Sequence, residues 1–149
     1  MPDPSTPPES AGGRDTGSSR LDARERVLEL LYEADLKDRA VGEIVAELPV
    51  VPDAFTVELL ALTETHRDEI DADLTRVARG WTLERMPIVD RAILRVGVAE
   101  LRWKREIPTA VVINEAVELA KRFSTDASSR YVNGVLSRLA GDHRGEPAC

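Results

Sequence analysis

The sequence predicts an all-α fold, and three observations support this class. Apolar residues recur at spacings of three and four along most of the chain, which is the period of one face of an α-helix. No segment alternates apolar and polar residues as a half-buried strand does. Pro49, Pro87 and Pro108 fall between the periodic segments, where residues that cannot continue a helix are expected. Because 42% of residues are hydrophobic but only 4% are aromatic, the core must consist mainly of Ala, Val, Leu and Ile.

Four helices are predicted in the first half of the chain. The first begins at Ser19 or Asp22, and a short second helix covers 41–48. The third opens with Asp53 as its N-cap, and the fourth covers 68–79. Their apolar faces are predicted at Ala23, Val27, Leu28, Leu31, Tyr32 and Ala34, then at Phe55, Leu59 and Leu62, and finally at Ile70, Leu74 and Val77.

Three helices are predicted in the second half. The helix over 87–103 is apolar around so much of its circumference that it belongs in the middle of a bundle. Gly97 inside it costs roughly 1 kcal/mol relative to Ala, so we expect another backbone to pack closely there. A helix over 111–123 follows, and Ser124 or Thr125 caps the last one. The apolar positions of the last two helices are Val112, Ala116, Leu119 and Phe123, then Tyr131, Val132, Val135, Leu136 and Leu139.

Composition divides the chain into one domain and two tails. Residues 1–18 hold four of the nine prolines and are predicted to be a disordered Pro/Ser/Gly-rich tail. Residues 19–140 form one helical domain, and 141–149 form a flexible C-terminal tail. The only cysteine is Cys149, which excludes a disulfide within the chain and fits a reducing cytoplasm. No apolar run reaches the roughly 18–20 residues of a membrane span, so we expect a cytoplasmic protein without membrane contact.

The overall charge of −7 conceals a strong asymmetry along the chain. Residues 53–73 contain seven acids and one base, residues 85–105 six bases and two acids, and residues 121–138 four bases and one acid. A locally basic face can bind a polyanion even on an acidic protein, because salt screens distant charges. The alternative is that these charges are only solvated helix faces.

The turn before the last helix combines the side chains that single-stranded RNA recognition requires. Cations contact phosphates, aromatic rings stack on bases, and an amide can bond to base edges. The alternative is that the two aromatic rings belong to the core. Phe123 ends an apolar stripe, which favours the core for that residue, whereas both interpretations stay open for Tyr131. The residues concerned are Lys121, Arg122, Phe123, Arg130, Tyr131 and Asn133.

Three blocks of the sequence resemble the bacterial transcription antitermination factor NusB family. They are ARERVLELLYEAD at 23–35, WTLERMPIVDRAILRVGVAEL at 81–101, and IPTAVVINEAVELAKRFSTDASSRYVNGVL at 107–136. The resemblance implies two three-helix bundles packed at a steep angle, with six or seven helices in all. It also implies a non-enzymatic factor that binds the boxA element of nascent ribosomal RNA together with NusE, a small-subunit ribosomal protein, and supports elongation by RNA polymerase.

The resemblance also implies two sets of site residues. Those expected to bind RNA are Arg20, Arg24 and Arg26 in the first helix, with Lys121, Arg122, Phe123, Arg130, Tyr131 and Asn133 around the last turn. Those expected to bind NusE are Arg85, Asp90 and Arg91. Two departures from the family pattern concern the RNA face: arginines are sparse over 20–24, and Ala127 stands where an acid is usual.

Other functions are less well supported by the residues. A nucleophilic site needs Ser or Cys with a His base, but His66 lies in an acidic helix and His143 in the predicted tail. We therefore expect no enzyme, cofactor or metal site. Two alternatives remain: a NusB-like module related to that of ribosomal RNA cytosine methyltransferases, and a structural homodimer that covers its own basic face. The chain ends at Cys149 without a methyltransferase domain, which disfavours the first.

Overall fold

The computed structural model describes residues 16–78 and 80–145, and within these ranges all regular structure is helical. The predicted all-α class is therefore confirmed. Residues 16–18 are predicted to be part of the disordered N-terminal tail, but they belong to a helix that begins at Thr16. The parts of the two predicted tails up to residue 15 and from residue 146 lie outside the described residues. The elements are α2 (Thr16–Lys37), α3 (Val41–Ala46), α4 (Ala54–Thr65), α5 (Arg67–Val77), the short 3₁₀ helix η1 (Leu83–Arg85), α6 (Ile88–Trp103), α7 (Thr109–Phe123) and α8 (Asp126–Arg144).

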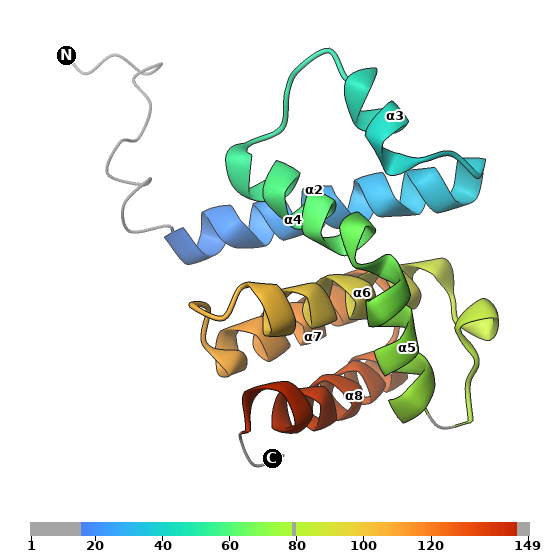
Figure 1. Ribbon diagram of the computed structural model, residues 1–149, viewed down its shortest axis with the longest axis vertical. Helices are drawn as coiled ribbons and strands as arrows, with labels where there is room; N and C mark the ends of the chain where they lie inside the picture. The colour runs from blue at the N-terminus through green and yellow to red at the C-terminus, as the bar shows by residue number, and fades with distance from the viewer. Residues whose placement is uncertain (1–15, 79, 146–149) are drawn as a thin grey trace.

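The helices form two groups that meet at α6. Figure 1 shows α2, α3 and α4 together near one end of the molecule and α6, α7 and α8 together near the other. Helix α5 runs from the end of α4 along the side of the second group, where it contacts α6 and α8. Helix α6 contacts α2, α4, α5, α7 and α8, and its residues from 92 to 101 are all buried. The prediction that the most apolar helix occupies the middle of the bundle is confirmed. The 3₁₀ helix η1 was not predicted, because three residues are too few to show a period.

Local capping signals in the sequence fix two helix starts. The side chain of Asp53 accepts a hydrogen bond from the backbone N–H of Thr56 at 2.8 Å, which caps α4 as predicted. Thr125 accepts from the backbone N–H of Ser128 at 3.0 Å and caps α8. Of the two candidates for the α8 cap, Thr125 is therefore the N-cap.

Gly97 lies where the central helix meets α8. A Cβ atom at this position would lie 2.7 Å from Cδ1 of Leu136, and the Leu136 side chain is fully buried. The expected approach of another backbone is wrong, because the neighbouring atoms belong to this leucine side chain. Gly97 leaves room for a large core residue, and this gain in packing offsets the helix propensity that glycine loses.

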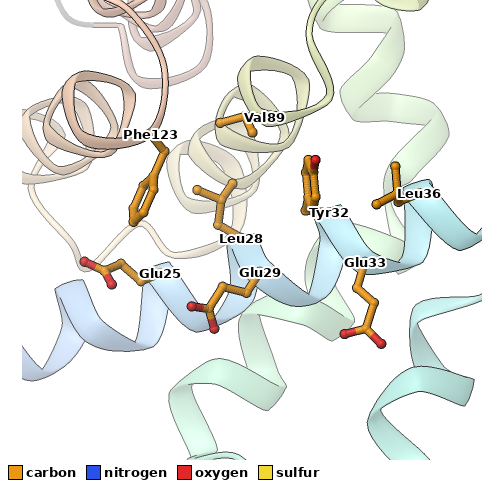
Figure 2. Close-up of a pocket in the computed structure, with 8 residues that line it drawn as sticks. All are labelled: Glu25, Leu28, Glu29, Tyr32, Glu33, Leu36, Val89 and Phe123. Carbon is orange, nitrogen blue, oxygen red and sulfur yellow. The ribbon is translucent and has the colours of Figure 1, made fainter.

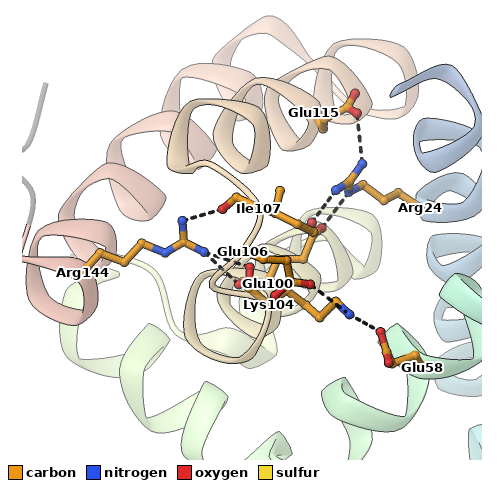
Figure 3. A network of polar contacts seen from close by, with 8 residues as sticks. All are labelled: Arg24, Glu58, Glu100, Lys104, Glu106, Ile107, Glu115 and Arg144. Carbon is orange, nitrogen blue, oxygen red and sulfur yellow. Dashed lines mark hydrogen bonds and ion pairs between the residues drawn. The ribbon is translucent and has the colours of Figure 1, made fainter. Parts of the chain in front are cut away.

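Helix α8 continues past residue 140, where the sequence analysis ends the domain. The guanidinium of Arg144 donates to the backbone oxygens of Leu101 at 3.0 Å, Ile107 at 2.7 Å, Glu100 at 3.1 Å and Lys104 at 3.2 Å, as Figure 3 shows in part. The last carbonyls of a helix lack partners within it, so one cation satisfies the end of α6. This contact holds the final turn of α8 against the domain.

Gly97 and Gly134 both lie inside helices but have different surroundings, and together they provide a matched stability test. Gly97→Ala should lower the free energy of unfolding by about 1 kcal/mol, because overpacking costs roughly 1–3 kcal/mol and helix propensity returns about 1. Gly134→Ala should raise it by up to about 1 kcal/mol, because a Cβ there meets no atom within 4 Å. Urea unfolding measures both, and a stabilising Gly97→Ala would contradict the packing described.

Candidate nucleic-acid interface

The turn between α7 and α8 is held by a cluster of hydroxyl groups. The Ser124 hydroxyl lies 3.0 Å from that of Ser128, and the Thr125 hydroxyl lies 3.1 Å from it. Ser128 in turn donates to Oδ2 of Asp90 at 2.6 Å. Because Asp90 is fully buried on α6, this bond anchors the turn to the central helix. The side chains that follow the turn are thereby placed on a rigid base.

Arg130 and Asn133 are both exposed on α8, and their spacing of three places them on neighbouring positions of one helix face. The Asn133 carbonyl oxygen accepts a hydrogen bond from the Ser137 hydroxyl at 3.1 Å. This bond orients the amide so that its N–H donors point away from Ser137. The cation and the amide that the sequence analysis singled out therefore both reach the surface.

Phe123 is 45% exposed, so the interpretation that places it in the core is wrong. Helix α7 ends at Phe123, so the ring lies at the end of the helix and stays partly open to solvent. The guanidinium of Arg122 lies 5.5 Å from the centre of the Phe123 ring and forms an ion pair with Glu25 of α2. Lys121 is exposed beside them.

Figure 2 shows that Phe123 faces a groove between α2 and the start of α6. The groove has a volume of about 440 Å³. Its apolar lining comes from α2, the start of α6 and the end of α7, whereas its acidic rim comes from α2 alone. The lining consists of Leu28, Tyr32, Leu36, Val89 and Phe123, and the rim of Glu25, Glu29 and Glu33.

Tyr131 is half-buried and combines a surface and a core role. Its ring packs edge-to-face against Trp81, with ring centres 5.3 Å apart and planes at 70°. Its hydroxyl oxygen is buried and has no hydrogen-bond partner. Burial raises the pKa of the Tyr131 phenol above its ordinary value, so the neutral ring is present throughout the physiological range.

The three arginines expected in the first helix lie in different environments. Arg24 is only 2% exposed; it donates to both carboxylate oxygens of Glu100 at 2.8 and 2.5 Å and to Glu115 at 3.0 Å. Figure 3 shows this network. Arg20 lies 5.0 Å from the centre of the Phe55 ring, and Arg26 pairs with Glu29 at the surface. Arg24 therefore joins α2 to α6 and α7 and does not face solvent.

The same network changes the acidity of one of its carboxyl groups. Burial raises the pKa of Glu115, and the nearby negative charges of Glu100 and Glu118 act in the same direction. Arg24 opposes this by favouring the ionised form. The positive charge of Arg24 therefore offsets the repulsion between the buried carboxylate of Glu100 and the half-buried carboxylate of Glu115.

The residues expected to bind a protein partner are only partly accessible. Arg85 is exposed at the end of η1, whereas Asp90 is buried beneath Ser128. Arg91 donates to the backbone oxygen of Leu83 at 3.0 Å. Arg85 thus offers charge at this surface, whereas Arg91 is engaged by Leu83 and Asp35. Asp90 positions the α7–α8 turn.

The basic stretch over 85–105 is largely neutralised by the acidic stretch over 53–73. Ion pairs between the described residues join them: Arg95 with Asp71 at 2.8 Å, Arg102 with Asp73 at 3.2 Å and with Glu69 at 3.7 Å, and Lys104 with Glu58. Both stretches therefore serve mainly to hold α4, α5 and α6 together. Near the α7–α8 turn, Lys121 and Arg130 are exposed and accessible to an external anion, whereas Arg122 is paired with Glu25.

Within the described residues, no group of three or more His, Cys, Asp or Glu side chains is arranged to hold a metal ion. None of the described helices is both long and apolar enough to cross a membrane.

Comparison with known proteins places this arrangement in a family. The NusB family profile matches residues 21–141. The chain belongs to the NusB family. A transcription antitermination protein NusB from Thermobifida fusca (strain YX) is 47% identical over 134 residues, which cover 86% of this chain and 93% of the relative.

Solved NusB structures have the same fold. NusB of T. maritima matches with a TM-score of 0.74 at 32% identity and covers 87% of this chain and 93% of that chain. A complex of the antitermination factors NusB and NusE with double-stranded RNA contains a chain that matches with a TM-score of 0.71 at 28% identity. That match covers 83% of this chain and 96% of the matched one.

Two features of this NusB-family site were missed by sequence reasoning. Trp81 stands in the connection between α5 and α6, where no periodic pattern marks a packing partner, yet it contacts Tyr131. The apolar groove beside Phe123 was also missed, because it forms between helices distant in sequence. Exposed apolar residues on α2 such as Tyr32 and Leu36 are a signal that could have indicated it.

Arg24→Ala tests the structural role of the buried arginine in this NusB-family protein. Removing one partner of a buried ion pair should lower the free energy of unfolding by about 3–5 kcal/mol, because two carboxylates lose their cation. Arg26→Ala is the matched control and should change it by less than about 1 kcal/mol, since its pair with Glu29 is exposed. Equal unfolding midpoints in urea would contradict this role.

Proposed function

We propose that this protein is a transcription antitermination factor that binds boxA RNA of nascent ribosomal RNA transcripts together with NusE. In this role it supports processive elongation by RNA polymerase as part of an antitermination complex. It acts in the bacterial cytoplasm as an adaptor without enzymatic activity or cofactor. The observation that carries the proposal is the match over most of the chain to a transcription antitermination protein at 47% identity.

The geometry of the α7–α8 turn supports an RNA surface there. Lys121 and Arg130 provide exposed cations, and Asn133 provides an exposed amide. Tyr131 offers part of a ring between them. Arg20 and Arg26 extend the surface on α2, whereas Arg24 is left out because Glu100 and Glu115 hold its guanidinium.

The groove beside Phe123 suits a protein partner better than RNA. Its apolar lining would be buried by apolar side chains of a protein, whereas RNA offers mainly charged phosphates. The three glutamates of the rim pair with Arg122, Arg26 and Lys37 of this chain. Val89 in this lining directly precedes Asp90, one of the residues expected at the NusE face. We therefore assign the groove to NusE, with Arg85 contributing charge nearby. Arg91 supports this surface through its bonds with Leu83 and Asp35.

The proposal is tested by mixing the full chain with NusE and a boxA-like single-stranded RNA. We expect weak RNA binding by the chain alone and a ternary complex with NusE, detected by sedimentation. Affinity should fall steeply with salt, because each neutralised phosphate releases counterions. A salt-independent isotherm would contradict the RNA surface. A stable homodimer that excludes RNA would favour the structural alternative.

Two exposed residues on α8 should affect RNA binding in different ways. Arg130→Ala should weaken binding of many sequences alike and make the salt dependence shallower, because a phosphate contact is lost. Asn133→Ala should reduce discrimination between sequences, by roughly 1–3 kcal/mol where it reads a base. Fluorescence titration with boxA-like and scrambled RNA measures both.

Arg39→Ala is the control for these variants, because Arg39 follows the far end of α2 and pairs with Glu47. It should leave RNA affinity unchanged. If Asn133→Ala unfolds the protein, its bond with Ser137 is structural, and base reading by this residue is refuted.

A further inference from the structure

A hollow of about 420 Å³ opens beside the aromatic pair of Trp81 and Tyr131. It lies between the connection that precedes α6 and the first turns of α8. Its lining consists of Gly80, Trp81, Thr125, Ala127, Ser128 and Tyr131. The hollow is therefore surrounded by two aromatic rings, by two small residues and by two residues that carry hydroxyl groups.

We propose that this hollow receives a nucleobase of single-stranded RNA, with Trp81 as a stacking residue that the family resemblance did not supply. This inference rests on the proposed function and assigns one base-binding position within it. Aromatic side chains bind unstacked bases because every base has a π-face. The volume is also within the range of small-molecule sites, roughly 300–1,000 Å³.

Trp81 is more exposed to solvent than a tryptophan with a purely structural role usually is. The side chain is 39% exposed, although tryptophan is normally well buried on average. Its edge-to-face contact with Tyr131 fixes the ring without covering it. Gly80 holds the preceding turn at φ +80°, a backbone conformation that favours glycine. The ring is therefore held in place and still open to a ligand.

Small residues and hydroxyl groups complete the hollow. Ala127 is exposed on the first turn of α8 and leaves the space above the rings open. Thr125 and Ser128 are fixed by the capping bonds of the turn. The Ser128 hydroxyl is fully used by Asp90, Ser124 and Thr125. The exposed Thr125 oxygen keeps one acceptor position for an N–H on the polar edge of a stacked base.

The surrounding charges give the RNA strand a direction. Tyr131 also lines an adjoining hollow whose other residues include Arg130 and Arg138. Trp81 also lines a second adjoining hollow, whose lining includes Glu84. Phosphates are attracted to the arginines and repelled by the glutamate. The backbone of the strand should therefore lie along α8 while the base enters between Trp81 and Ala127.

Filling the hollow tests this assignment. Ala127→Leu should weaken binding of fluorescein-labelled oligouridine by between about fivefold and about 100-fold, the loss expected for one stacked base. Ala110→Leu is the matched control, because Ala110 is exposed at the corresponding second position of α7. Circular dichroism and thermal unfolding establish that both variants are folded.

Tryptophan fluorescence gives an independent readout. Trp103→Phe leaves Trp81 as the only tryptophan of the chain. Oligouridine should quench its emission, whereas inorganic polyphosphate, which has charge but no bases, should not. Trp81→Phe in the otherwise unchanged chain should leave the emission of Trp103 insensitive to RNA.

The outcomes separate this inference from the function on which it rests. If the wild-type chain binds neither oligouridine nor boxA-like RNA with NusE present, the proposed function fails and the base position with it. If the wild type binds but Ala127→Leu binds equally well, only the base position is overturned. Quenching by polyphosphate equal to that by oligouridine would likewise overturn stacking on Trp81.

Discussion

The buried contact between Arg24 and two glutamates is the constraint on which the arrangement of the two helix groups depends. Removing an arginine and a carboxylate from water is costly, and here the cost is offset by a bidentate bond to Glu100 and a third bond to Glu115. The Phe55 ring of α4 covers the guanidinium at 5.3 Å. One side chain on α2 therefore contacts α4, α6 and α7 together. The groove beside Phe123 and the Arg122–Glu25 pair both require α2 to be held in this position.

Ion pairing inside the fold also explains how an acidic protein can present a cationic surface. Its strongly charged segments are used mainly inside the molecule. Asp35 of α2 lies within 3.6 Å of the guanidinium groups of Arg67, Arg91 and Arg95, and Arg95 also binds Asp71 in a bidentate manner. These contacts join α2, α5 and α6. Charge counted along the sequence overstates what is available for an external partner. Neither alternative considered for the basic segments describes residues 85–105, because Arg91, Arg95 and Arg102 are held in internal ion pairs.

The sequence predicted those features that depend on residues close together in the chain. Helix α4 and its Asp53 cap follow from a local pattern, because the cap bonds to a backbone N–H only three residues ahead. Arg24 could not be assigned in this way, since Glu100 is 76 residues away and only the fold brings them together. The family resemblance placed Arg24 with the RNA-binding residues, whereas its burial makes it structural.

The errors at helix ends have a related cause. Hydrophobic periodicity indicated that Phe123 is part of the core, but a period cannot show that the helix ends there and leaves the ring uncovered. Periodicity also gave no reason to extend α8 to Arg144, because the bonds that hold this residue are to carbonyl oxygens of α6 and of the loop that follows it. Trp81 lies in a connection and has no pattern at all. The exposure of aromatic residues and the positions of helix ends are thus decided by tertiary contacts, which a local sequence pattern does not contain.

The accessible surface also explains why a second protein is physically reasonable in RNA recognition. Few cations remain unneutralised near the α7–α8 turn, and affinity for a polyanion rises with the number of phosphates that are neutralised. A partner seated in the groove beside Phe123 would add contacts without requiring more charge on this chain. Linking two modest surfaces makes the second contact intramolecular, which raises overall affinity without any new cation.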